Sequence, residues 1–170
     1  MIVIICSARS GSTSFGKYLS EYHNLDFRPN WHIGGPAIYR YMIHRITYDE
    51  ACDFVLDHNV YLLDRRNKNE QAESLAFRKK KYGNDFFKYH TREVYDIWDE
   101  DYKNECKKEF IEHSETIQRI RDDSGKEIIF YEDLFKDTNI LKKLDIFDKD
   151  LYNKYINPIN RNRLFKKWIL

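Results

Sequence analysis

Short, uniformly apolar runs alternate along this chain with longer segments in which apolar side chains recur at helical spacing. The runs at residues 2–6, 60–63 and 128–131 are rich in β-branched and aromatic side chains. Such runs are typical of strands that are buried on both faces of a parallel sheet. Residues 25–27 form a further, shorter candidate strand.

Helices are expected between these strands. They are predicted at residues 13–22, 37–45, 47–57, 68–82 and 99–123, with short helices up to about residue 155. Thr47 and Glu50 form a capping box at the start of one helix, and Gly125 stops the longest helix. Residues 29–35, punctuated by proline and glycine, are expected to form a loop. The alternation of strands and helices predicts a three-layer α/β domain with a mostly parallel central sheet, spanning residues 1–170 as a single unit.

Composition narrows the range of functions. The 170 residues carry a net charge of +1, so no global electrostatic field draws the protein to nucleic acid or to an acidic membrane. The three cysteines, Cys6, Cys52 and Cys106, are scattered, which indicates neither a disulfide framework nor a zinc site. The apolar opening at residues 1–6 is too short for a signal peptide or a membrane span, so we expect a cytoplasmic protein.

The first candidate site follows the first strand, in the stretch Cys6-Ser-Ala-Arg-Ser-Gly-Ser-Thr-Ser-Phe-Gly-Lys-Tyr18. A strand, a small-residue turn and a helix together bind anions, because unpaired backbone N–H groups and the helix dipole converge on the turn. From Gly11 onward the stretch approaches the nucleotide-binding pattern G-x-x-x-x-G-K-[ST]. Tyr18 stands where that pattern needs a magnesium-binding Ser or Thr. If Gly11 is instead the second glycine of the loop, Ser12 stands where the lysine should be, and Arg9 supplies the positive charge.

A second candidate site begins where the strand at residues 60–63 ends. Arg66 should face the same crevice as the first loop, because ligands bind at the carboxyl ends of parallel strands. Ser74 lies eight residues after Arg66, and Arg78 follows one helical turn later on the same face. A hydroxyl between two guanidinium groups suits a phosphate, whose oxygens match the guanidinium fork.

Together these stretches resemble the sulfotransferases that use 3′-phosphoadenosine-5′-phosphosulfate (PAPS), in particular the tyrosylprotein and bacterial-type members. The 5′-phosphosulfate loop of that family, P-[KR]-S-G-[ST]-[ST], is similar to Ala8-Arg-Ser-Gly-Ser-Thr13, with alanine in place of proline. The family's 3′-phosphate site is an arginine at a strand end with a serine eight residues later, which Arg66 and Ser74 match. The tyrosylprotein branch adds a further arginine, which corresponds to Arg78.

A third stretch extends this resemblance. The family carries a Tyr-Glu-x-Leu stretch whose tyrosine reaches the nucleotide, and Tyr131-Glu-Asp-Leu134 is similar to it. The resemblance covers roughly residues 1–80 and 126–135. It implies a fold like that of the P-loop NTPases, PAPS as the cofactor, 3′,5′-bisphosphoadenosine as the product, and no metal ion.

The resemblance also implies roles for individual residues. The 5′-phosphosulfate would be held by Arg9, Ser10, Gly11, Ser12 and Thr13. The 3′-phosphate would be held by Arg66 and Ser74, with Arg78 and Tyr131 beside them. The expected reaction moves a sulfuryl group to a hydroxyl or amine of a small-molecule, carbohydrate or peptide acceptor.

Sulfuryl transfer also needs a general base and a donor to the leaving oxygen. The expected donors are Arg9, Ser12 or Thr13, and the N-terminus of the helix that follows the loop. The glutamate that serves as base in the tyrosylprotein branch is missing here, since its position falls on Pro29. His32 is the nearest titratable group of suitable pKa and is the predicted base. The weaker candidates are His23, Asp26 and His44.

Two other functions remain open from the sequence. A P-loop kinase acting on a small molecule would use ATP, magnesium and the stretch from Gly11 to Lys17. A catalytically silent nucleotide-binding module would retain the loops without turnover. The sequence leaves the acceptor and the oligomeric state open.

Overall fold

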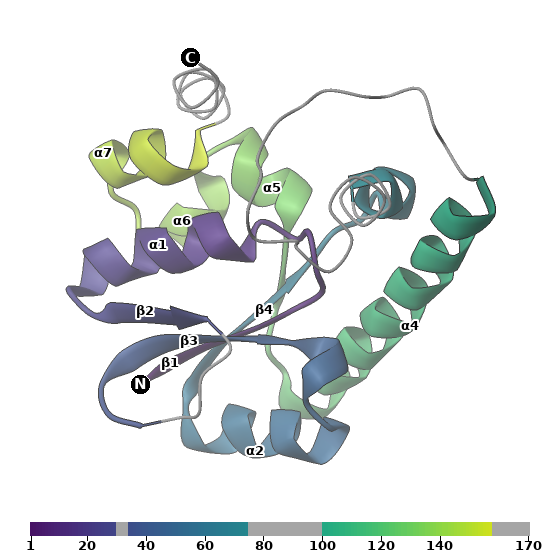
Figure 1. Ribbon diagram of the computed structural model, residues 1–170. Coiled ribbons are helices and arrows are strands. Elements are labelled where there is room, and N and C mark those ends of the chain that lie inside the picture. The colour runs from purple at the N-terminus through teal and green to yellow at the C-terminus, as the bar shows by residue number, and fades with distance from the viewer. Residues whose placement is uncertain (30–33, 75–99, 158–170) are drawn as a thin grey trace.

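A five-stranded sheet forms the centre of the protein, and every strand pair in it is parallel (Figure 1). The computed structural model describes residues 1–29, 34–74 and 100–157. The strands are β1 (Ile2–Cys6), β2 (Asp26–Pro29), β3 (Ala37–Met42), β4 (Asn59–Asp64) and β5 (Ile128–Phe130). Their order across the sheet is β2-β3-β1-β4-β5, which places β1 at the centre.

Helices cover both faces of this sheet, and the predicted three-layer α/β architecture is therefore confirmed (Figure 1). One face carries α1 (Ser12–His23), α5 (Tyr131–Lys136), α6 (Asn139–Lys143), α7 (Lys149–Leu151) and the π-helical turn η3 (Tyr152–Ile156). The other face carries the 3₁₀ turn η1 (Ile43–Arg45), α2 (Tyr48–Asp57) and α4 (Glu100–Ser124). Residues 68–74, which follow β4, are also helical.

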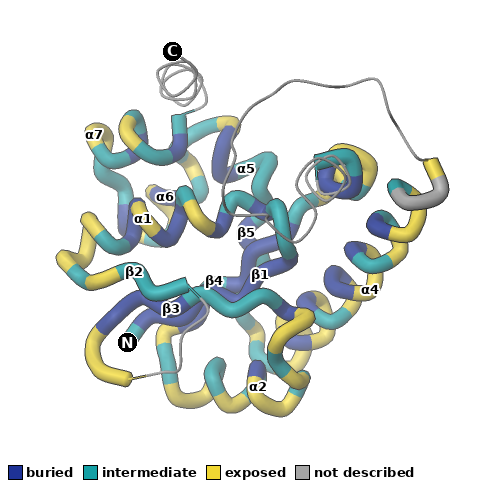
Figure 2. The backbone as a smooth tube through the Cα atoms, viewed as in Figure 1, coloured by how far each residue is buried: buried dark blue, intermediate teal, exposed yellow. Residues whose placement is uncertain are grey.

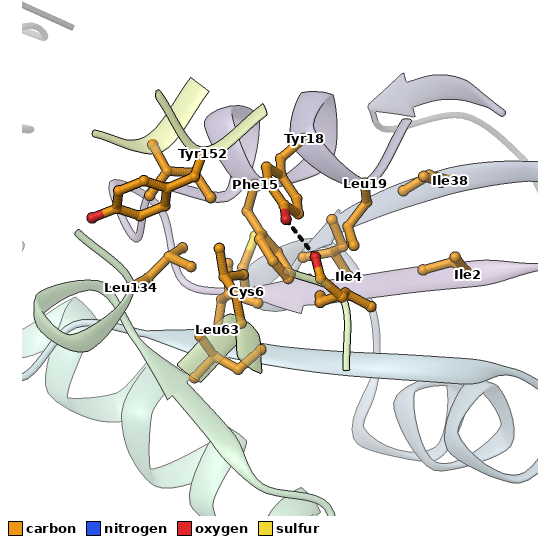
Figure 3. Packing of buried hydrophobic residues seen from close by; sticks show 14 of the residues in the cluster. Ile2, Ile4, Cys6, Phe15, Tyr18, Leu19, Ile38, Leu63, Leu134 and Tyr152 are labelled. Atoms are coloured by element: carbon orange, nitrogen blue, oxygen red, sulfur yellow. Dashed lines mark hydrogen bonds between the residues drawn. The ribbon is translucent and has the colours of Figure 1, made fainter. Parts of the chain in front are cut away.

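Two apolar clusters fill the space between the sheet and these helices. Side chains of β1 alternate between them: Ile4 packs into the cluster under α1, and Ile5 into the cluster over α2 and α4. Because both faces are covered, every residue of β1 is buried, as its uninterrupted apolar run predicted (Figure 2). Figure 3 shows Phe15, Tyr18 and Leu19 of α1 among the side chains of the first cluster.

Several predicted helices have the expected boundaries and local causes. Thr47 caps α2 in a full capping box, in which its hydroxyl accepts from the Glu50 N–H and the Glu50 carboxylate accepts from the Thr47 N–H. Gly125 follows α4 with a φ of +67°, the left-handed conformation that commonly ends a helix. Four apolar residues of α4 are buried against the rest of the protein, namely Cys106, Phe110, Ile117 and Ile120.

The helix predicted at residues 37–45 is wrong. Residues 37–42 form β3, which pairs with β2 on one side and with β1 on the other, and only residues 43–45 form a helical turn. Ile38 and Tyr39 are fully buried on opposite faces of the sheet, as the period of a strand requires. A smaller difference is that β2 extends to Pro29, which was expected to begin a loop.

Two further observations concern the cysteines and the helices. Cys6, Cys52 and Cys106 are all free thiols. Within residues 1–29, 34–74 and 100–157, no helix combines the length and the apolar character needed to cross a membrane.

Candidate anion-binding site

The loop between β1 and α1 forms the centre of the candidate site. It leaves the sheet at Ser7, whose N–H donates to the Leu63 carbonyl at 3.2 Å, and it ends at Gly11. The first helical hydrogen bond of α1 runs from the Phe15 N–H to the Gly11 carbonyl at 3.1 Å. The N–H groups of residues 12–14 therefore have no partner within the helix, and none of the described side chains caps this end. Such a helix start favours an anion.

Gly11 allows this loop to lie directly against α5. Its φ is +79°, and a Cβ built on its backbone would lie 2.5 Å from Cε2 of Phe135 and 3.0 Å from Cδ2 of Tyr131. Both the backbone conformation and the lack of space require glycine at this position. Tyr131, which was predicted to lie beside the nucleotide, thus packs against the predicted phosphosulfate loop.

Arg9 connects the first predicted site with the second. It has a φ of +64°, an uncommon conformation for a residue other than glycine. Its Nε donates to the Ser74 hydroxyl at 2.8 Å, although the two residues are 65 positions apart in the sequence. The structure therefore brings together one residue predicted for the 5′-phosphosulfate and one predicted for the 3′-phosphate.

Arg66 is held by a different partner. Its two terminal nitrogens donate to the two carboxylate oxygens of Asp133, each at 2.6 Å, and its guanidinium lies 4.0 Å from the centre of the Phe130 ring. This guanidinium lowers the pKa of Asp133, and Asp133 raises the pKa of Arg66. Arg66 and Ser74, which the sequence grouped on one phosphate, therefore have separate partners in this structure.

Glu132 lies at the start of the helical residues 68–74. Its carboxylate accepts hydrogen bonds from the N–H groups of Arg66 at 3.0 Å and Asn67 at 2.9 Å. Arg65 lies beside it, with its guanidinium 4.4 Å from the centre of the Tyr131 ring and Nε 3.8 Å from the carboxylate. A carboxylate of the protein itself thus occupies a position that suits an external anion.

Arg40 is a further cation of this region that the sequence analysis missed. It lies on β3, and its Nη1 donates to the Thr13 hydroxyl at 2.6 Å. Burial lowers its pKa, and its Nε is buried without a hydrogen-bond partner among the described residues. A strand assignment for residues 37–42 would have revealed it, because side chains two apart on a strand share a face and Ile38 packs under α1.

A buried network of hydrogen bonds around Asp64 holds the beginning of the loop in place. The Asp64 carboxylate accepts from the hydroxyls of Ser7 at 2.9 Å and Ser114 at 2.5 Å, and from the Lys68 ammonium at 2.7 Å. Gln71 donates to the Ser7 hydroxyl at 2.9 Å. Because each of these groups is paired, the network ties β1, β4 and α4 together and fixes the beginning of the loop.

No family model, curated protein or solved structure matches this chain. Its function has therefore to be inferred from the side chains around the loop.

Packing explains why the sequence resembles the kinase pattern G-x-x-x-x-G-K-[ST]. Gly16 lies within α1, and a Cβ there would be only 2.2 Å from Cε2 of Phe27, so the second glycine of the pattern makes room for an aromatic ring. Lys17 is exposed in the second turn of α1, beyond the loop. Tyr18 is buried, with its hydroxyl donating to the Ile146 carbonyl and accepting from the Asp148 N–H.

Two predicted site residues, His32 and Arg78, lie outside the residues that the structure describes. The weaker candidate bases are described. His23 has a pKa lowered by burial, and Asp26 pairs with Arg28 at 3.2 Å. His44 stacks on His113, which lies on α4.

Proposed function

We propose that this protein is a sulfotransferase that takes a sulfuryl group from PAPS and passes it to a hydroxyl or amine of a small-molecule, carbohydrate or peptide acceptor. The observation that carries the proposal is the hydrogen bond from Arg9 to Ser74 at 2.8 Å. It joins the two stretches that resemble the family's two phosphate sites, and a single nucleotide with phosphates at both ends suits such an arrangement.

The residues of the first loop fit an anion such as the 5′-phosphosulfate. The Ser10 hydroxyl is fully buried, and no nitrogen or oxygen atom of the described residues pairs with it. The Nε of Arg40 is also buried without a hydrogen-bond partner among the described residues, and the Nη1 of the same side chain donates to Thr13. Buried polar groups are normally paired, so two such donors from residues close to the start of α1 support an anion at this place.

At the 3′ end the fit requires an exchange of partners. The Arg66 guanidinium pairs with Asp133, so a 3′-phosphate on Arg66 would have to replace that carboxylate. Such an exchange is favourable in kind, because a phosphate offers the same bidentate geometry and more negative charge. Both side chains are about half exposed, at 51% and 43%, so breaking their ion pair costs little.

When bound, PAPS would supply an activated sulfuryl group with adenosine bisphosphate as its leaving group. The chain's own contribution is to bind and orient this group. Arg9, Ser12 and the N-terminus of α1 would stabilise the charge that develops on the leaving oxygen. His32 remains the predicted base that accepts the acceptor's proton.

The position of Lys17 favours this function over a P-loop kinase. In a kinase of that type the lysine reaches the phosphates from the loop, whereas Lys17 lies in the second turn of α1 and is exposed. The sulfotransferase proposal has no role for it. Lys17 therefore provides a matched control for Arg9, since both are cationic and lie on the same loop-and-helix unit.

The experiment is a turnover assay that measures release of 3′,5′-bisphosphoadenosine from PAPS with phenolic, carbohydrate and tyrosine-peptide acceptors. We expect acceptor-dependent release that falls about 10²–10³-fold in Arg9→Ala and is unchanged in Lys17→Ala. Binding of 3′,5′-bisphosphoadenosine without turnover on any acceptor would contradict the enzymatic proposal in favour of a silent nucleotide-binding module. Magnesium-dependent use of ATP that requires Lys17 would favour the kinase instead.

A further inference from the structure

A cluster of metal-ligating side chains lies away from the loop, where η1 meets α4. It consists of His44, which follows β3, and of Glu109 and His113, which are one turn apart on α4. One ligand atom from each residue lies within 4.8 Å of the other two. Figure 1 shows η1, the short turn after β3, beside α4, and the two elements are in contact.

His113 provides a second, independent indication of a ligand. The residue is only 9% exposed, and its Nδ1 is buried without a hydrogen-bond partner among the described residues. The ring lies between Phe110, at a centroid distance of 6.0 Å, and His44, at 5.3 Å. Its Nε2 is 3.9 Å from the Glu109 carboxylate, beyond hydrogen-bond distance. Among the described residues, this buried imidazole therefore lacks a full set of hydrogen-bond partners.

The spacing of these groups is close to that of a metal site. Ligand bonds of about 2.0–2.1 Å in a tetrahedral zinc site place the ligand atoms about 3.3 Å apart. The ligand atoms of the three residues lie at most 4.8 Å apart, so each distance between them has to decrease by about 1.5 Å at most. His44 is exposed and Glu109 is partly exposed, so side-chain rotations of these two residues can supply the movement.

We infer that His44, Glu109 and His113 bind a divalent transition-metal cation, and the chemistry of the ligands favours Zn²⁺. Two imidazoles and one carboxylate suit zinc and its neighbours, whereas Mg²⁺ and Ca²⁺ prefer sites made of oxygen atoms alone. Three protein ligands leave a fourth position for water or another ligand. The cation would clamp the turn after β3 to α4. This site is separate from the loop at Arg9 and does not depend on the proposed function.

The test uses the full chain, freed of metal by a chelator and then titrated with zinc sulfate in a calorimeter, with magnesium chloride as a second probe. We expect one zinc ion per chain and no comparable heat from magnesium. His44→Ala and Glu109→Gln should each weaken zinc binding by at least the 10–100-fold that is typical even for outer-shell partners. The matched control is Glu112→Gln, an exposed carboxylate on the same helix, which should leave zinc affinity unchanged.

A spectrum of the cobalt-loaded protein distinguishes this site from the cysteines. We expect the visible bands of Co²⁺ without a thiolate-to-metal charge-transfer band, since the proposed ligands are nitrogen and oxygen. A strong charge-transfer band would overturn the proposal, as would equal zinc affinity in His44→Ala and the wild type. Because His44 is exposed, its replacement should leave the fold intact, and circular dichroism checks this.

Discussion

At the scale of single residues, the loop after β1 depends on the glycine at position 11. Gly11 combines a φ of +79° with direct contact between its backbone and the rings of Tyr131 and Phe135. Gly125 has a similar φ of +67°, but a Cβ there would have no atom of the described residues within 4 Å. A comparison of alanine substitutions at the two glycines therefore distinguishes the effect of backbone strain from the effect of steric crowding.

Gly11→Ala should lower the free energy of unfolding by about 2–5 kcal/mol, of which about 1–2 kcal/mol is left-handed strain and the rest is overpacking against α5. Gly125→Ala, the control, should lower it by only about 1–2 kcal/mol. Urea unfolding of both variants and the wild type measures the difference. Equal losses in the two variants would mean that the close contact between the loop and α5 is not present.

A second prediction at this scale concerns pH. Arg66 lowers the pKa of Asp133, and a carboxyl whose pKa falls on folding stabilises the folded state above its unfolded value of about 3.9. That stabilisation is lost as the pH falls through the lower, folded pKa. Asp133→Asn should therefore cost up to about 1 kcal/mol between about pH 5 and 7, the usual range for an exposed ion pair, and less below about pH 4. Urea unfolding from about pH 7 to 3 tests this, and a cost that persists undiminished in acid would contradict it.

At the scale of secondary-structure elements, the important contact is that between α5 and the start of the helical residues 68–74. Two acidic side chains in the first turn of α5 accept hydrogen bonds from Arg66. Glu132 accepts from its backbone N–H, and Asp133 accepts from its guanidinium. If a 3′-phosphate binds there, it competes with the Asp133 carboxylate.

Asp133→Asn should therefore bind 3′,5′-bisphosphoadenosine about two- to fivefold more tightly than the wild type, since up to about 1 kcal/mol of ion pairing no longer opposes binding. Calorimetric titration measures the affinity. Asp122→Asn is the matched control, because it removes the same charge from another exposed arginine pair, with Arg121 on α4. Weaker binding in Asp133→Asn would show that Asp133 supports the nucleotide site instead of competing for it.

The elements also show what the sequence could and could not predict. The capping box of Thr47 and Glu50 is local, so α2 was predicted with its correct start and end. Residues 37–42 were assigned to a helix, because a short apolar run does not distinguish helix from strand and their place between β2 and β1 depends on tertiary pairing. Arg40 was missed for the same reason. The Arg66 pair joins positions 67 residues apart, and no local pattern indicates it.

At the scale of the whole molecule, parallel topology explains why distant stretches meet. The loop after β1, the residues after β4 and the first turn of α5 all follow the carboxyl ends of strands, so they lie at one edge of the sheet. The order of strands and helices in the sequence was enough to predict that these three segments lie close together. It was not enough to predict which side chains pair there, because the pairs depend on side-chain orientation and on the charges of Glu132 and Asp133.

The most direct test of this account is a calorimetric comparison of 3′,5′-bisphosphoadenosine with AMP on the full chain. If the protein grips both phosphate ends of one nucleotide, the bisphosphate should bind about 10–150-fold more tightly. That range corresponds to one additional charge-assisted hydrogen bond of about 1.5–3 kcal/mol. Equal affinities for the two nucleotides, or tighter binding of ATP with magnesium than of either, would contradict it.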